Sequence, residues 1–274
     1  MNYTLHTRKR VYDLGKKTLI MGILNVTPDS FSDGGKFSDL EKAVAQAVAM
    51  ERDGADIIDI GGESTRPGHT PVSEQEELER ITPVIKKLSG MLTIPISVDT
   101  YKAEVARQAV EAGADIINDV WGAKRDSKMA EVAASLNVPI ILMHNRDNKG
   151  YHSLIADMKE DLKESIAIAK EAGVRDENII LDPGIGFAKD HDDNLEVMRH
   201  LETFQELHYP ILLATSRKRF IGQVLDLPAE ERMEGTGATV CLGISKGAHI
   251  VRVHDVKPVA RMAKMMDAML GKGE

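Results

Sequence analysis

Polar side chains follow a series of short apolar runs, at the point where each run ends. These terminal residues are Asn25, Asp99, Asn118, Asp182, Lys218, Arg252 and His254. Carboxylates, a carboxamide and cations gathered in one place can bind a polar heterocycle and an anionic group. A parallel α/β barrel places its chemistry at the C-terminal ends of its strands, so this pattern predicts an enzyme.

Three of these residues could bind a flat heterocycle. Asp99, Asn118 and Asp182 are expected to project from three strand ends towards one axis. A guanidine-like edge, such as the aminopyrimidinone of a pterin, presents parallel N–H donors that match a carboxylate, and a carboxamide serves both donor and acceptor edges. Lys218 would then face a ring carbonyl or imine nitrogen. Because buried acids are costly unless they are paired, a structural ion-pair network with Lys218 or Arg252 is the alternative.

The last apolar run carries a candidate anion site. Arg252 and His254 lie two positions apart, so on a strand both side chains point to the same face. Such a pair beside the last strands of a barrel suits a phosphate or diphosphate. Asn25 could supply one neutral oxygen to Mg²⁺, which takes the rest of its shell from water and substrate phosphates. A histidine such as His254 is by itself more often a hydrogen-bonded structural residue.

Two loops rich in glycine and hydroxyl residues follow the first two apolar runs. The loop at residues 25–35 suits a mobile lid that orders over a ligand, although ordinary turn chemistry gives the same composition. The glycines of residues 61–68 allow the backbone to approach a ligand closely. Within this second loop, Thr65 and Arg66 offer a hydroxyl and a forked cation that could hold an anion.

Strand-like and helix-like segments alternate along the whole chain. Strands are predicted over residues 19–26, 57–61, 94–99, 116–120, 139–144, 179–182, 211–215 and 250–254. Helices are predicted over residues 40–52, 74–88, 103–111, 127–136, 154–171, 194–207, 231–246 and 259–270. This alternation predicts a parallel sheet covered by helices. An open doubly wound sheet also fits, but the count of eight favours a (β/α)8 TIM barrel. We expect residues 1–18 to form a short extension beneath the barrel and residues 19–274 a single domain.

Composition narrows the class of protein. The 274 residues carry a net charge of −8, which argues against a nucleic-acid binder because phosphate backbones need a basic surface. The single cysteine, Cys241, excludes an intramolecular disulfide and fits a reducing compartment. No apolar run approaches the roughly 18 residues of a membrane span. The sequence therefore predicts a soluble, cytoplasmic protein without a membrane partner.

Several motifs resemble those of the dihydropteroate synthase family. Residues 21–35 and 59–68 are similar to its first two signatures, and shorter matches cover residues 97–100, 118–119, 182–187, 216–218 and 252–254. The resemblance implies a TIM barrel that joins (7,8-dihydropterin-6-yl)methyl diphosphate to 4-aminobenzoate, forming dihydropteroate and pyrophosphate in folate biosynthesis. It also implies Mg²⁺, a homodimer through late helices, and sulfonamides as competitors at the aminobenzoate position.

The resemblance assigns a role to each motif residue. It implies a pterin pocket of Asp99, Asn118, Asp182 and Lys218, with Asp99, Asp182 and Lys218 taking part in catalysis. It implies a diphosphate side of Thr65, Arg66, Arg252 and His254, with Asn25 beside Mg²⁺. It implies an aminobenzoate border of Thr27, Pro28, Phe187, Lys218 and Arg219. Many family members carry serine at the position of Arg219, so the chain departs from the family pattern at the contact with the benzoate carboxylate.

Three alternatives stay open at this point. A pterin-binding barrel of the methyltransferase type would share the Asp and Asn positions, although the full first loop and residues 216–218 argue against it. An aldolase could form a Schiff base on Lys218 at a strand end, but it would not need the diphosphate-side residues. The third alternative is a non-catalytic pterin-binding paralogue.

Overall fold

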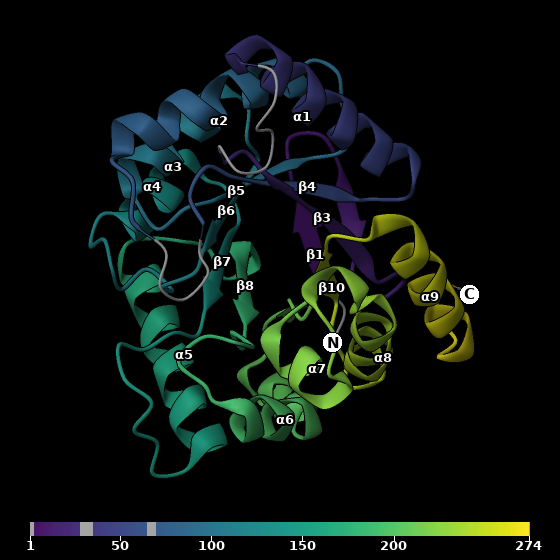
Figure 1. The fold of residues 1–274 in the computed structure, drawn as a ribbon. Helices are drawn as coiled ribbons and strands as arrows, with labels where there is room; N and C mark the ends of the chain where they lie inside the picture. Colours follow the sequence, from purple (N-terminus) through teal and green to yellow (C-terminus); the bar gives the residue numbers. More distant parts are fainter. Residues whose placement is uncertain (1–2, 28–34, 65–69, 274) are drawn as a thin grey trace.

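Eight parallel strands form a ring that is surrounded by helices (Figure 1). The computed structural model describes residues 3–27, 35–64 and 70–273. The strands are β3 (Leu19–Asn25), β4 (Ile57–Gly61), β5 (Ile96–Asp99), β6 (Ile116–Asp119), β7 (Ile140–Met143), β8 (Ile179–Asp182), β9 (Leu212–Leu213) and β10 (Ile250–Val253). Hydrogen-bonded neighbours run in the order β8-β7-β6-β5-β4-β3-β10-β9, and a parallel bridge between Leu181 and Ile211 joins β8 to β9. The predicted TIM barrel is confirmed, and the open sheet is wrong.

Helices follow the strands around the outside of the ring. They are α1 (Gly35–Arg52), α2 (Glu74–Ser89), α3 (Ala103–Ala112), α4 (Met129–Leu136), α5 (Leu154–Glu171), α6 (His191–Arg199), α7 (Arg219–Leu225), α8 (Met233–Ser245) and α9 (Val256–Met269). The short helix α7 was not predicted. Within the described part of the chain, no helix is both long and apolar enough to cross a membrane.

The single helix predicted over residues 194–207 is wrong. Helix α6 ends at Arg199, and a 3-10 helix follows over Leu201–Leu207. Leu201 and Phe204 are both buried, and they lie three residues apart. A helix with three residues per turn places this pair on one face, and that face is buried.

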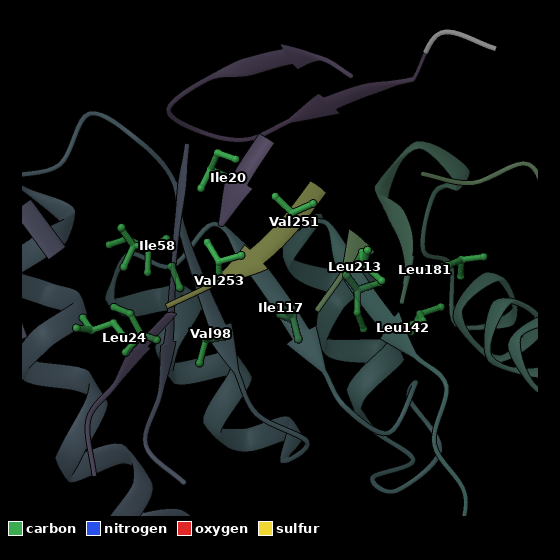
Figure 2. Packing of buried hydrophobic residues seen from close by; sticks show 14 of the residues in the cluster. Ile20, Leu24, Ile58, Val98, Ile117, Leu142, Leu181, Leu213, Val251 and Val253 are labelled. Carbon is green, nitrogen blue, oxygen red and sulfur yellow. The ribbon is translucent and has the colours of Figure 1, made fainter. Parts of the chain in front are cut away.

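The side chains of the strands divide into two apolar clusters. Outward-facing residues such as Ile58, Ile117 and Val251 pack under the helices (Figure 2). Inward-facing residues fill the barrel axis: Leu19, Met21, Ile57, Ile116, Ile141, Ile180, Leu212 and Ile250. Because side chains alternate along a strand, the next inward position lies two residues further on. At that level the chain carries Asp59, Asn118, Asp182 and Arg252, so the C-terminal end of the axis is polar.

A hairpin covers the opposite end of the barrel. Strands β1 (Thr4–His6) and β2 (Val11–Asp13) pair antiparallel and lie across the strand ends in Figure 2. Leu5 and Leu14 are buried against the inward-facing cluster. The turn of the hairpin is fastened to the barrel, for example by Lys9, whose Nζ donates to the carbonyl oxygen of Leu92 at 2.8 Å. The hairpin therefore closes the apolar end and leaves the polar end as the place for a ligand.

Candidate active site

Four strands contribute one connected network at the polar end of the axis. Arg252, on β10, donates from Nε to Asp59 Oδ2 at 2.6 Å and from Nη2 to Asp99 Oδ2 at 2.7 Å. Asn118 Nδ2 donates to Asp59 Oδ2 at 3.2 Å. The strand register pairs Asp99 with Asn118, so their side chains lie next to each other. Asp59, Asp99 and Asn118 are buried, while the Arg252 side chain keeps 16% of its surface exposed.

Asp59 is a central residue that the sequence prediction did not include. It follows Ile57 by two positions, just as Asp182 follows Ile180. Both aspartates therefore occupy the inward position directly above the apolar layer. The two-residue spacing from Ile57 could have predicted that Asp59 faces the axis. It was overlooked because Asp59 lies inside its apolar run and is followed by Ile60.

The ion-pair network considered as an alternative for Asp99 is present, but it leaves acceptors free. Asp59 Oδ1 and Asp99 Oδ1 are buried and have no hydrogen-bond partner among the residues that the structure describes. Burial raises the pKa of Asp99 to about 7, against the opposing effect of Arg252. Buried polar atoms without a partner are rare in native proteins. These two oxygens therefore suit a ligand that brings N–H donors.

A second group of residues lies beside β8 and β9. Lys218 donates from Nζ to the carbonyl oxygen of Ile185, and Nζ lies 4.8 Å from the centre of the Phe187 ring. The buried Asp182 accepts from the backbone N–H of Gly184 at 2.7 Å. Desolvation lowers the pKa of Lys218 to about 8, although Asp182 opposes this shift. The structure thus brings Asp182, Phe187 and Lys218 together, as the resemblance implied.

The mouth of the barrel holds an excess of acids. On the axis, the three carboxylates of Asp59, Asp99 and Asp182 face the two cations of Arg252 and Lys218, and each of these cations interacts with Asp99 and Asp182. A third cation, Lys189, acts on Asp182 from behind the segment that follows β8. Burial also raises the pKa of Asp182, because the charged form loses hydration. In a desolvated site, this excess favours a ligand or intermediate that carries positive charge.

Arg252 and His254, which were predicted to bind a diphosphate together, contact different partners. Arg252 binds the carboxylates, whereas His254 Nδ1 lies 2.9 Å from Ser216 Oγ. Both residues still project from the end of β10. Their binding of a diphosphate stays a prediction, as do the binding roles of all the residues named here.

The remaining predicted residues lie around the same rim or outside the described part of the chain. Asn25 ends β3 and is half-buried, as is Thr27 just after it. Arg219 is exposed at the start of α7. Pro28, Thr65 and Arg66 lie outside the described residues.

No group of three or more His, Cys, Asp or Glu side chains within residues 3–27, 35–64 and 70–273 could hold a metal ion. A magnesium ion held by an all-protein cage is therefore not supported there. The half-buried Asn25 fits a different arrangement, in which one neutral oxygen meets an ion that is carried mainly by water and substrate phosphates.

The fold and the site define a class, namely an α/β-barrel enzyme with a polar, desolvated site at the C-terminal end of its axis. Residues 21–254 match the family described as pterin binding enzymes. The dihydropteroate synthase of Bacillus subtilis (strain 168) is 67% identical over 269 residues, which cover 98% of this chain and 94% of that protein.

Two solved structures are similar over almost the whole length. A Xanthomonas albilineans dihydropteroate synthase with 4-aminobenzoic acid is 40% identical, with a TM-score of 0.94 and coverage of 98% of this chain and 99% of that one. The Yersinia pestis enzyme with a sulfonamide drug is 38% identical, with a TM-score of 0.91 and the same coverage. The chain belongs to the dihydropteroate synthase family, whose members are transferases. This confirms the predicted family over the methyltransferase and aldolase alternatives.

Proposed function

We propose that the polar end of the barrel condenses (7,8-dihydropterin-6-yl)methyl diphosphate with 4-aminobenzoate by an SN1-like reaction, forming dihydropteroate and pyrophosphate. The observation that carries this proposal is the excess of buried carboxylates at Asp59, Asp99 and Asp182 over the cations that face them. The family identifies the overall reaction, and the charge distribution supports the order of its steps.

The pterin occupies the axis in this proposal. Its guanidine-like edge donates to the carboxylates, including the unpartnered Oδ1 atoms of Asp59 and Asp99. Asn118 offers a carboxamide beside Asp99, and Lys218 donates to a ring carbonyl or imine nitrogen. The Lys218 bond to the Ile185 carbonyl keeps the ammonium at the same side of the pocket.

The reaction begins when the bond between the exocyclic carbon and the diphosphate oxygen breaks. Its electron pair leaves with the diphosphate, and the positive charge spreads into the electron-rich dihydropterin. Asp99 and Asp182 stabilise that charge because they are already fixed in a desolvated site and need no reorganisation. The arylamine nitrogen of 4-aminobenzoate then forms the new C–N bond and loses a proton.

The leaving diphosphate lies on the side of Arg252 and His254, with Asn25 at the end of the neighbouring strand β3 and Thr65 and Arg66 as further predicted ligands. When bound, Mg²⁺ neutralises phosphate charge and weakens the bond to the leaving group. Arg252 lies between the diphosphate side and the carboxylates of Asp59 and Asp99. Its guanidinium can therefore interact with the negative charge that develops on the diphosphate.

The aminobenzoate enters beside Phe187 and Lys218, bordered by Thr27, Pro28 and the exposed Arg219. The solved relatives that hold 4-aminobenzoic acid and a sulfonamide drug support this substrate and predict that sulfonamides compete with it.

A homodimer through the late helices and a cytoplasmic location complete the proposal. Large apolar side chains are exposed on α7, α8 and α9: Val224, Leu225, Leu242, Met265, Met269 and Leu270. Exposed apolar side chains gathered in one region suit a subunit contact. The single thiol of Cys241 fits a reducing compartment.

Pyrophosphate release from the dihydropterin diphosphate tests the function. It should depend on Mg²⁺, and in the presence of 4-aminobenzoate it should match dihydropteroate formation mole for mole. Tight binding of the pterin without release would assign the chain to the non-catalytic paralogue or the methyltransferase type instead.

A further inference from the structure

The segment that links β8 to α6, residues 183–190, is held by two lysines. Towards the barrel axis, Lys218 binds the carbonyl oxygen of Ile185 and lies over the Phe187 ring. Towards helix α5, Lys189 donates from Nζ to the carbonyl oxygens of Gly184 and Phe187, each at 3.0 Å. The segment thus has one cation on its substrate side and another behind it.

Lys189 is an unusual residue to find in this place, because it is buried and, among the residues that the structure describes, no carboxylate lies within hydrogen-bond distance of it. Its third contact is His144 Nδ1, at 2.9 Å. Burial lowers the pKa of His144 to about 4, so the imidazole is neutral at ordinary pH. His144 Nε2 lies 2.9 Å from Asp161 Oδ2 on α5, and this contact places the ring proton on Nε2 and leaves Nδ1 as an acceptor.

The three contacts of Lys189 match the three donors of an ammonium group. Burial, together with the charge of Lys218, lowers the pKa of Lys189 to about 7, although Asp182, Asp193 and Asp161 oppose this shift. The acceptors at Gly184, Phe187 and His144 favour the charged form against that shift. A neutral amine would have one donor too few for them, so the geometry is built around the ammonium.

The backbone of the segment has little room to move. Gly184 and Gly186 have φ values of +68° and +86°. A Cβ at Gly184 would overlap the carbonyl oxygen of His144, and one at Gly186 would lie 3.0 Å from Lys218 Cδ. Tyr151 also donates from its hydroxyl to the carbonyl oxygen of Ala188 at 2.9 Å. Close packing and side-chain hydrogen bonds therefore hold the segment, which has no regular structure of its own.

We propose that Lys189 is a positioning residue for the aminobenzoate side of the active site. By holding the carbonyl groups of Gly184 and Phe187 towards α5, it fixes the Phe187 ring and leaves the Ile185 carbonyl free for Lys218. Lys189 acts through this segment and contacts no reacting atom. The inference rests on the proposed function, because it assigns Phe187 and Lys218 to the aminobenzoate border.

Lys189→Met tests this role, because methionine fills a similar volume without a donor. The change removes the lysine donor from both carbonyl groups, although the Gly184 carbonyl still accepts from the backbone N–H of Phe187. We expect the KM for 4-aminobenzoate to rise about tenfold. The KM for the pterin diphosphate should rise less than that for 4-aminobenzoate, because Asp59, Asp99 and Asn118 bind the pterin from other strands, whereas Asp182 and Lys218 adjoin the segment. Both constants and the thermal midpoint would be measured on the same preparation.

Asp267→Asn is the matched control for a loss of stability alone. Asp267 is buried and accepts from the backbone N–H and the hydroxyl of Thr18, at the covered end of the barrel. It should lower the thermal midpoint and leave both KM values unchanged. If Lys189→Met likewise lowered the midpoint and left the KM for 4-aminobenzoate unchanged, Lys189 would be structural and the proposal would be overturned.

A second variant keeps the test decisive if Lys189→Met does not fold. His144→Gln retains the lysine and removes its imidazole acceptor, so the KM for 4-aminobenzoate should rise about threefold. A folded His144→Gln protein with both KM values unchanged would contradict the proposal. Dihydropteroate formation by the unmodified protein in the same assay separates failure of this role from failure of the proposed function.

Discussion

A single guanidinium organises the active site at the level of residues. Arg252 binds two buried aspartates at once, so the network of Arg252, Asp59 and Asp99 carries one net negative charge when all three groups are ionised. Buried charge is costly when it is not compensated. The ligand-free protein compensates by raising the pKa of Asp99, and the substrate compensates by bringing N–H donors and, during the reaction, positive charge.

Asp59→Asn should lower kcat/KM by about tenfold to a hundredfold, because hydrogen bonds to charged groups contribute about 1.5–3 kcal/mol. The variant keeps the shape of the side chain and removes the charge that orients Arg252. Asp56→Asn is the control, since Asp56 is buried just before the same strand but accepts from Ile20 and Lys17. Equal kcat/KM values for the two variants would show that the Asp59 charge has no special role.

Binding of the pterin should depend on pH on both sides of neutrality. Asp99 must be ionised to accept N–H donors, so its pKa of about 7 predicts weaker binding as the pH falls below that value. Lys218 must be protonated to donate, so its pKa of about 8 predicts weaker binding as the pH rises above it. Calorimetric titration with a pterin across this range measures both limbs. An affinity independent of pH between 6 and 9 would contradict these assignments.

The sequence allowed most of this site to be predicted, for a physical reason. Asp99, Asn118 and Asp182 end apolar runs, and burial of the runs forces those side chains to the polar end of the axis. Asp59 and Lys189 were not predicted, because their roles depend on contacts that form only in the folded structure. Asp59 accepts a hydrogen bond from Arg252, which is 193 residues away in the sequence. Lys189 meets the carbonyl groups of its own segment and a histidine of β7's C-terminal end.

Different secondary-structure elements form the two ends of the barrel. The strands alone would leave an open apolar end, and the β1–β2 hairpin covers it with Leu5 and Leu14. The eight strands could be predicted because they are aliphatic and buried on both faces. The hairpin could not, because its strands have three residues each and are stabilised by the barrel beneath them. The break after α6 was also not predicted, because Leu201 and Phe204 lie three residues apart, a spacing that fits an α-helix as well as a 3-10 helix.

Leu14→Ala should reduce the free energy of unfolding by about 2–5 kcal/mol, because it leaves a cavity in a fully packed cluster. Both KM values should stay the same, since the active site lies at the other end of the strands. Val11→Ala on the same hairpin removes an exposed side chain, and it should change stability by less than about 0.5 kcal/mol. Denaturant unfolding measures the difference. A loss of substrate binding in Leu14→Ala would mean that the hairpin contributes to the active site as well.

In the molecule as a whole, the apolar end of the barrel axis contributes to stability and the polar end carries the active site. From the hairpin upwards, the axis changes from an apolar core to a desolvated set of carboxylates and cations, and in β4, β6, β8 and β10 this change takes two positions of the strand. The outer helices and their apolar contacts fix the strands that carry those groups (Figure 2). We propose that this preorganised charge stabilises a cationic dihydropterin before the arylamine attacks.

The secondary deuterium isotope effect on kcat/KM, with deuterium on the exocyclic methylene carbon of the pterin diphosphate, tests that claim most directly. It should be measured at low 4-aminobenzoate concentration, so that the chemical steps limit the rate. Ionisation changes the carbon from sp3 to sp2, and the account predicts a clearly slower reaction of the deuterated substrate. Equal rates for the two substrates would contradict it and indicate direct displacement of the diphosphate by the amine.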